Sequence, residues 1–223
     1  MKKLHLLALL GLVLAFSSCS TARFASNFSA DTARQGMVLL GPSALHFYLD
    51  EKNHSTIDDS LSFETQELLA NMVTSNGLPV TRRVQLDSTE HVEAIAFIDY
   101  IKNKSKNVQM SCPIPTALDR LLEAEGERYG LLIFCEGMSR DKKGFAKEVT
   151  RNILVGAAVA LLTLGTMTVA GSAYSAYSGI YAVVLDSMTD RVMFYNFKEE
   201  EHSPLEVQKT FDQLENLLKD LKK

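Results

Sequence analysis

The chain is poor in the residues that mark several special classes of protein. Cysteine occurs three times in 223 residues, and a chain of this length can bury a sufficient core without a disulfide scaffold. Basic residues are not in excess, since 23 Lys and Arg face 27 Asp and Glu and give a formal charge of −4. This mild acidity argues against nucleic acid as a partner. With 46% hydrophobic and 22% charged residues, the composition excludes a disordered or collagen-like chain.

The motifs of common enzyme and metal-binding classes are also missing from the sequence. It has no Gly-x-Ser-x-Gly elbow, no phosphate-binding glycine loop, no Cys-x-x-Cys and no His-x-x-x-His. Glu136 could act as an acid or base, but its place after an apolar run more often marks the end of a strand. His54 lies in an acidic segment, residues 50–59, whose spacing fits no known metal site. We therefore expect a protein that is not an enzyme, with no catalytic residue, metal or cofactor.

What is present at the N-terminus has the order of a secretory signal. Lys2-Lys3 precedes an apolar run, Leu4–Phe16, that is short for a membrane span, and Ser17-Ser18-Cys19 follows. A cysteine directly after two small residues resembles the lipobox of bacterial lipoproteins, with Phe16 where leucine is more usual. The alternative is an ordinary signal peptide that is cleaved nearby, with Cys19 incidental.

The lipobox resemblance implies removal of residues 1–18, which would leave 205 residues with a formal charge of −6. Cys19 would carry a diacylglycerol on its thiol and a further acyl chain, such as palmitate, on its amine, and several acyl chains anchor a protein firmly. Ser20 stands where such lipoproteins have Asp when they remain in the inner membrane, so the outer membrane is favoured. Residues 20–24 lack the acidic run that some anaerobes use for surface export. We expect a periplasm-facing protein.

Hydrophobic patterning predicts an α/β or α+β fold, with a mixed sheet and helices packed on it. Residues 19–36 are rich in small polar residues and predict a tether, and residues 37–223 predict a single domain. Expected strands cover 37–40, 45–49, 80–86, 129–135, 180–185 and 192–197, of which the last two form a hairpin. Expected helices cover 63–75, 87–101 and 116–127, and Asp87 with Glu90 and Thr116 with Asp119 have capping-box spacing.

A C-terminal amphipathic helix is expected after Ser203-Pro204, where Glu206 completes a capping pattern. Its apolar residues follow steps of four and three: Val207, Phe211, Leu214, Leu218 and Leu221. We expect this stripe to pack on the domain. A coiled coil is the alternative, although coiled coils usually extend over three or four heptads.

A long uncharged segment extends from Asn152 to Leu185, and its first part, 153–173, is long enough to span a bilayer as a helix. Small residues there would allow close helix contact in a membrane. A core helix is the other interpretation, because a crossover between the strands at 129–135 and 180–185 would need one. The sequence leaves both interpretations open.

Two stretches resemble envelope domains related to the curli-secretion lipoprotein and to the N-terminal domain of the Tol-system translocation protein. Residues 114–122 with 128–132 resemble their helix-then-strand unit, and residues 181–186 with 191–195 resemble their later hairpin. The whole chain is also similar to small lipoproteins of Gram-negative gut anaerobes. The resemblance implies a role in envelope assembly or transport, with other envelope proteins as partners and no catalytic residues.

Cys112 and Cys135 are the two cysteines that remain if Cys19 is acylated. Export would place them where disulfides can form, and the expected helix and strand would bring them to the same end of the fold. A bridge between them is one prediction. The other is two buried free thiols, since cysteine is among the most buried residue types.

Four positions follow the pattern Asp, then Ser or Thr, then an aliphatic residue, Met or Thr, which resembles the O-glycosylation signal of some gut anaerobes: Thr32, Ser60, Ser88 and Ser187. Glycans would need accessible loops. Helix caps and turns explain the same Asp-Ser pairs without modification.

Two functions from different classes follow from these observations. The first is a lipid-anchored envelope protein with a non-catalytic binding or assembly role at the periplasmic face of the outer membrane. The second is a membrane-inserting or pore-forming oligomer that uses residues 153–176. The sequence does not specify the oligomeric state.

Overall fold

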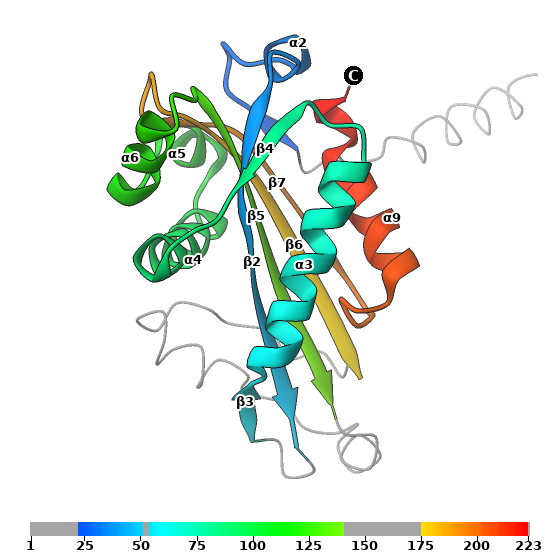
Figure 1. Cartoon of the computed structure of the whole chain (residues 1–223). Helices are drawn as coiled ribbons and strands as arrows, with labels where there is room; N and C mark the ends of the chain where they lie inside the picture. Colours follow the sequence, from blue (N-terminus) through cyan, green and yellow to red (C-terminus); the bar gives the residue numbers. More distant parts are fainter. Residues whose placement is uncertain (1–21, 51–53, 141–174, 223) are drawn as a thin grey trace, which may run out of the picture.

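A computed structural model describes residues 22–50, 54–140 and 175–222. Its centre is a seven-stranded mixed sheet in the order β1-β7-β6-β5-β2-β3, with β4 also paired to β2 (Figure 1). The strands are β1 (Arg23–Phe24), β2 (Met37–Leu49), β3 (Ser55–Ile57), β4 (Val80–Val84), β5 (Tyr129–Arg140), β6 (Ala176–Asp186) and β7 (Arg191–Glu200). This architecture, with helices packed on the sheet and a C-terminal helix, confirms the predicted fold class.

Helices cover both faces of the sheet (Figure 1). They are α2 (Ala30–Ala33), α3 (Asp59–Ser75), α4 (Ser88–Lys102), α5 (Lys106–Ser111), α6 (Thr116–Ala124) and α9 (Val207–Leu218), which the 3₁₀ turn η1 (Lys219–Leu221) extends. One core lies between the sheet and α3 with α9. A second core lies on the opposite face, under α4 and α6. The alternation of side chains along each strand divides the apolar residues between these two cores.

Strand β2 is continuous where the sequence predicts two short strands with a turn at Gly41-Pro42. The strand accommodates these residues by a register shift against β5 between Leu40 and Ser43. An irregularity of this kind tolerates proline, which has no N–H to donate to a ladder. Paired to β5 along almost its whole length, β2 is 13 residues long.

Strands β5, β6 and β7 form an antiparallel meander, which confirms the predicted hairpin of β6 and β7. The crossover argument for residues 153–173 is wrong in its premise, because β5 and β6 are antiparallel neighbours and need no crossover helix. Residues 153–173 lie outside the described residues, as does the rest of the predicted inserting segment up to residue 174, whereas Ser175 and Ala176 are described. Among the residues that are described, no helix is long and apolar enough to cross a membrane.

The helix starts agree with the sequence in one case and differ in two. The Asp87 and Glu90 capping box is confirmed, since each side chain accepts from the other residue's backbone N–H at 2.7–2.8 Å. The Thr116 capping box is wrong, because Pro115 occupies the N-cap position and no side chain caps α6. Ser203 begins a turn rather than the helix, since its N–H donates to Glu206 Oε1 at 3.1 Å and α9 starts at Val207.

The expected tether is shorter than the sequence suggests. Within residues 19–36, β1 pairs antiparallel with β7, so Arg23 lies opposite Tyr195 and Phe24 opposite Phe194. Phe28 and Ala33 are buried in the core beneath α9. The correction has a plain physical reason: two phenylalanines in an otherwise small and polar segment bury enough apolar surface to hold it on the domain.

Helix α9 packs on the sheet, as the sequence predicts, through a face slightly rotated from the expected one. Leu214, Leu217 and Leu218 are at most 1% exposed, whereas Val207 is 59% exposed. Gln213 lies on the same buried face, where its amide donates to the carbonyls of Ser178 and Lys198. The stripe is therefore a packing surface of the domain.

Candidate functional site

The structure places the two cysteines of the predicted bridge on opposite faces of the sheet. Cys112 belongs to the core under α4 and α6, and Cys135 belongs to the core under α3 and α9. Both are buried free thiols, and burial raises the pKa of Cys135 to about 12, which leaves it inert at neutral pH. A bridge does not fit this arrangement, because the sheet separates the side chains. Cys19 lies outside the described residues.

The four residues of the predicted glycosylation pattern differ in accessibility. Ser60 and Ser88 are exposed in the first turns of α3 and α4, and Thr32 is half-buried in α2. The Ser187 hydroxyl donates to the carbonyl oxygens of Glu127 and Arg128 at 3.1 and 3.3 Å. Ser60 and Ser88 are thus the positions with room for a sugar, and glycosylation remains a prediction.

The acidic segment around His54 forms local structure. His54 Nδ1 lies 3.1 Å from Asp50 Oδ2, and Asp58 Oδ1 accepts from the backbone N–H of Leu61 as the cap of α3. In the described part of the chain, no group of three or more His, Cys, Asp or Glu side chains is arranged to hold a metal ion.

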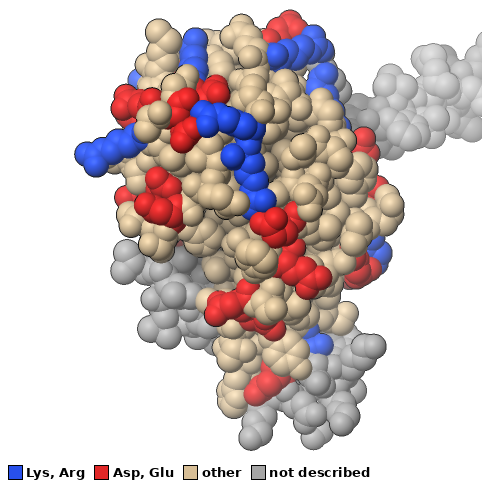
Figure 2. Space-filling view, viewed as in Figure 1, with Lys and Arg blue, Asp and Glu red and all other residues tan. Residues whose placement is uncertain are grey.

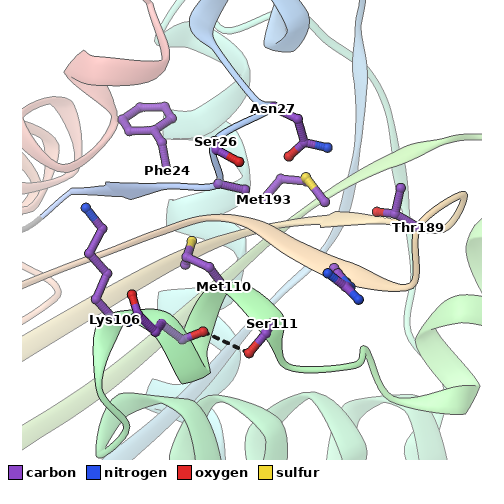
Figure 3. A pocket seen from close by; sticks show the side chains of 11 residues that line it. Phe24, Ser26, Asn27, Lys106, Met110, Ser111, Thr189 and Met193 are labelled. Atoms are coloured by element: carbon purple, nitrogen blue, oxygen red, sulfur yellow. Dashed lines mark hydrogen bonds between the residues drawn. The ribbon is translucent and has the colours of Figure 1, made fainter.

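A pocket of about 620 Å³ lies at one end of the sheet, between the segment after β1, helix α5 and the start of β7 (Figure 3). The two methionines Met110 and Met193 lie in its middle, with Lys106 to one side and Asn27 and Thr189 to the other (Figure 3). The remaining lining residues are Phe24, Ala25, Ser26, Asn107, Ser111 and Arg191. Its volume is within the usual range for small-molecule sites.

Specific contacts hold the pocket walls together. Arg23 Nη1 of β1 donates a hydrogen bond to Gln109 Oε1 of α5, and Gln109 Nε2 in turn donates to the Ile101 carbonyl at 2.8 Å. The backbone N–H of Ala25 donates to the Met193 carbonyl at 2.9 Å. The walls are therefore preformed, although they come from three separate parts of the chain.

The turn between β6 and β7, which carries Thr189 and Arg191, is fixed by a buried carboxylate. Asp186 accepts from Arg128 Nε and Nη2 at 3.0 Å each, from Thr189 Oγ1 at 3.1 Å and from the Met188 N–H at 3.0 Å. Burial alone would raise the pKa of Asp186, but these hydrogen bonds outweigh it and lower the pKa. The turn keeps one wall of the pocket in place.

The pocket is basic in an acidic protein. Lys106 and Arg191 are exposed at its rim, and none of the eleven described residues that line it is acidic. The face that carries α3 and β4 differs, since basic side chains over β4 lie beside acidic ones along α3 (Figure 2). There Arg83 pairs with Glu67 at 2.7 Å. The pocket therefore offers positive charge that no lining carboxylate neutralises.

A second polar cluster is buried on the α4 face of the sheet. Lys102 Nζ lies 3.7 Å from Glu136 Oε2 and 4.0 Å from Asp99 Oδ1. Glu136 is 2% exposed, and among the described residues its Oε1 has no hydrogen-bond partner. Burial raises the pKa of Glu136 while Lys102 opposes the shift. Nothing in the sequence beyond the position of Glu136 indicated this cluster.

Two contacts between a serine hydroxyl and a histidine ring occur in the described chain. Ser43 Oγ lies 3.1 Å from His91 Nδ1, and Ser139 Oγ lies 2.9 Å from His46 Nε2. Ser43 is fully buried and His46 is 1% exposed, and burial lowers the pKa of both histidines. Neither pair lines the pocket of Figure 3.

Comparisons with known proteins found only distant similarity. No protein-family model and no curated protein matches the sequence. A solved PelC dodecamer from Paraburkholderia phytofirmans is similar with a TM-score of 0.42 at 12% identity, over 91% of this chain and 97% of that one. The C-terminal domain of LpoB from Salmonella enterica is similar with a TM-score of 0.34 at 11% identity, over 80% of this chain and 88% of that one. Lipoprotein GNA1162 from Neisseria meningitidis is similar with a TM-score of 0.31 at 10% identity, over 82% of this chain and 98% of that one. Similarities at this level carry no functional inference for this chain.

Proposed function

We propose that this chain is a lipid-anchored envelope protein with a non-catalytic binding or assembly role at the periplasmic face of the outer membrane. Cys19 is the anchor in this proposal, with residues 1–18 as its signal peptide. The proposal includes other envelope proteins as partners and no cofactor.

The observation that carries the proposal is the position of the pocket relative to the signal sequence. The Lys2-Lys3 start, the apolar run and Ser17-Ser18-Cys19 support export and acylation. Only a few residues later, the chain enters β1 and then forms a wall of the pocket. A preformed recess directly after the anchor suits a binding protein held at a membrane.

The chemistry of the pocket supports binding over catalysis. Its nucleophile-type side chains, Ser26, Ser111 and Thr189, have no histidine or carboxylate among the lining residues that are described, whereas an activated hydroxyl needs an adjacent base. Ser111 Oγ instead donates to the Asn107 carbonyl within its own helix at 2.8 Å (Figure 3).

Intact-mass measurement of the protein from native membranes tests the anchor. Acyl mass on a chain that begins at Cys19 is expected, and a Cys19→Ala variant should leave the membrane fraction. An unmodified N-terminus elsewhere would contradict the proposal. If the Cys19→Ala chain, freed of its signal, still partitions into detergent-free membranes, the inserting function of residues 153–176 is favoured instead.

A further inference from the structure

We propose that the pocket between β1, α5 and β7 binds the phosphate-bearing headgroup of an anionic phospholipid in the membrane to which the protein is anchored. This inference rests on the proposed function, since it takes Cys19 as the point of attachment. It adds the ligand class of the pocket.

The chain length between the anchor and the pocket brings the pocket to the bilayer surface. Phe24, the first residue that lines the pocket, is only five positions after Cys19. Fully extended, a chain of this length spans at most about 18 Å, whereas the polar interfacial region of one leaflet is about 5–8 Å thick. The recess would therefore lie within about 18 Å of the acylated residue, close enough for headgroups to reach it.

The charge of the pocket selects for an anion. Lys106 and Arg191 are the two cations of the lining, and they are unopposed there by a carboxylate. No ion pair joins either side chain to another group in the part of the chain that the structure describes. Arginine and lysine are the usual side chains for phosphate recognition.

The uncharged part of the lining suits the rest of a phospholipid headgroup. Ser26, Asn27 and Thr189 supply hydrogen-bonding groups at the rim, and Phe24, Met110 and Met193 supply an apolar floor. A glycerol headgroup has hydroxyls next to its phosphate and acyl esters beyond it, so it presents both kinds of surface. A free inorganic anion would use the two cations but would leave the methionine floor unused.

The pocket is preformed, which lowers the entropic cost of binding. The Arg23–Gln109 hydrogen bond joins β1 to α5, and the Ala25–Met193 backbone bond joins the next residues to β7. The Asp186 cluster holds the turn with Thr189 and Arg191. A ligand would thus meet both cations without first ordering the walls.

Native mass spectrometry of the full protein, extracted from membranes in a neutral detergent, tests the inference. The probes are short-chain phosphatidylglycerol, phosphatidylcholine with the same chains, and inorganic phosphate. One phosphatidylglycerol should bind per chain, with the double variant Lys106→Gln/Arg191→Gln at least fivefold weaker. The matched control, Arg120→Gln/Lys209→Gln, removes the same charge from exposed sites outside the pocket and should bind like wild type.

Each other result would overturn the inference. Equal binding by the double variant, or equal weakening in the control pair, would show that the pocket cations are not responsible. Equal binding of phosphatidylcholine would remove the requirement for an anion, and displacement of lipid by an equal concentration of inorganic phosphate would reduce the pocket to a small-anion site. The same spectra report the acyl mass on Cys19. A protein without acyl chains and a protein without pocket binding are therefore distinguished in one measurement.

Discussion

At the scale of residues, one lysine is shared by two buried carboxylates. Lys102 lies within 4.0 Å of both Asp99 and Glu136, so with both acids ionised the cluster holds one uncompensated negative charge. Burial raises the pKa of each acid, and Lys102 opposes both shifts. The folded-state pKa of each acid lies above its unfolded-state pKa, so between these two pH values the folded protein binds more protons than the unfolded chain. The free energy of unfolding therefore falls as pH rises through the folded-state pKa.

Glu136→Gln should remove most of this loss of stability on raising the pH. The variant keeps the shape and loses the desolvated charge, so we expect it to be more stable than wild type at pH 8 by about 1 kcal/mol, with the difference vanishing below about pH 4. Urea unfolding between pH 4 and 9 measures this. Glu215→Gln, at a side chain 57% exposed, is the control, and it should leave the pH dependence of the free energy of unfolding unchanged. A Glu136→Gln variant less stable than wild type at pH 8 would contradict the assignment.

Asp186 should show the opposite pH dependence, because its hydrogen bonds lower its pKa. The stabilisation is present above the unfolded-state pKa and is lost as pH falls through the folded one. Asp186→Asn should cost about 2 kcal/mol at pH 7, and the cost should shrink below about pH 4. Thermal unfolding at pH 7 and pH 3 tests this, with Asp31→Asn as the control because that carboxylate is 84% exposed. A cost that is equal at both pH values would refute the role of the charge.

At the scale of elements, the C-terminal helix shows how the same apolar stripe divides into buried and exposed positions. Leu217→Ala should destabilise the domain by about 3 kcal/mol, because it leaves a cavity in the core beneath α9. Val207→Ala, at the exposed start of the same helix, should change stability by less than about 0.5 kcal/mol. Urea unfolding of the two variants measures the contrast. Similar effects at both positions would show that α9 does not pack as described.

Elements whose signals are local could be predicted from the sequence. The Asp87 cap, the β6–β7 hairpin and the apolar stripe of α9 each depend on neighbouring residues, and each is present. Apart from the helix starts at Thr116 and Ser203, the predictions that failed depend on distant partners. The neighbour that continues β2 through Gly41-Pro42 is β5, some ninety residues later, and the tether folded because β7 accepts β1.

The pocket could not be predicted for the same reason. Its walls come from residues 24–27, 106–111 and 189–193, and none of these segments carries a motif. Phe24 and Phe28, two large apolar residues in a mostly small and polar segment, are the one sequence feature that indicates packing of this segment on the domain. Of the two alternatives for Cys112 and Cys135, the structure has the two buried free thiols and not the bridge, because the alternation of β5 sends the side chain of Cys135 to the face away from α6.

At the scale of the whole molecule, the N-terminal segment should behave as part of the domain. Phe24 packs on Phe194 with ring centroids 4.9 Å apart, and Phe28 packs on Tyr129 at 5.6 Å. Trypsin should therefore cleave slowly after Arg23 in the native protein, whereas a flexible tether would be cut at once. Phe28→Ala should accelerate cleavage at this site, as intact mass would show. Rapid cleavage of the unaltered chain would contradict the docking of β1.

If Cys19 carries the proposed acyl chains, the docking of β1 would also limit how far the protein extends from the membrane. The 13 residues of β2 cover about 40 Å at the rise of a strand, and β2 begins at the end of the sheet where the pocket lies and finishes at the opposite end. With the proposed acyl chains on Cys19, four positions before β1 begins at Arg23, that length would act as a spacer. A partner that binds at the distal end would be held about 40 Å farther from the bilayer than one at the pocket. The protein would then select partners by their distance from the bilayer, because it would reach only those that lie at the height of its distal end.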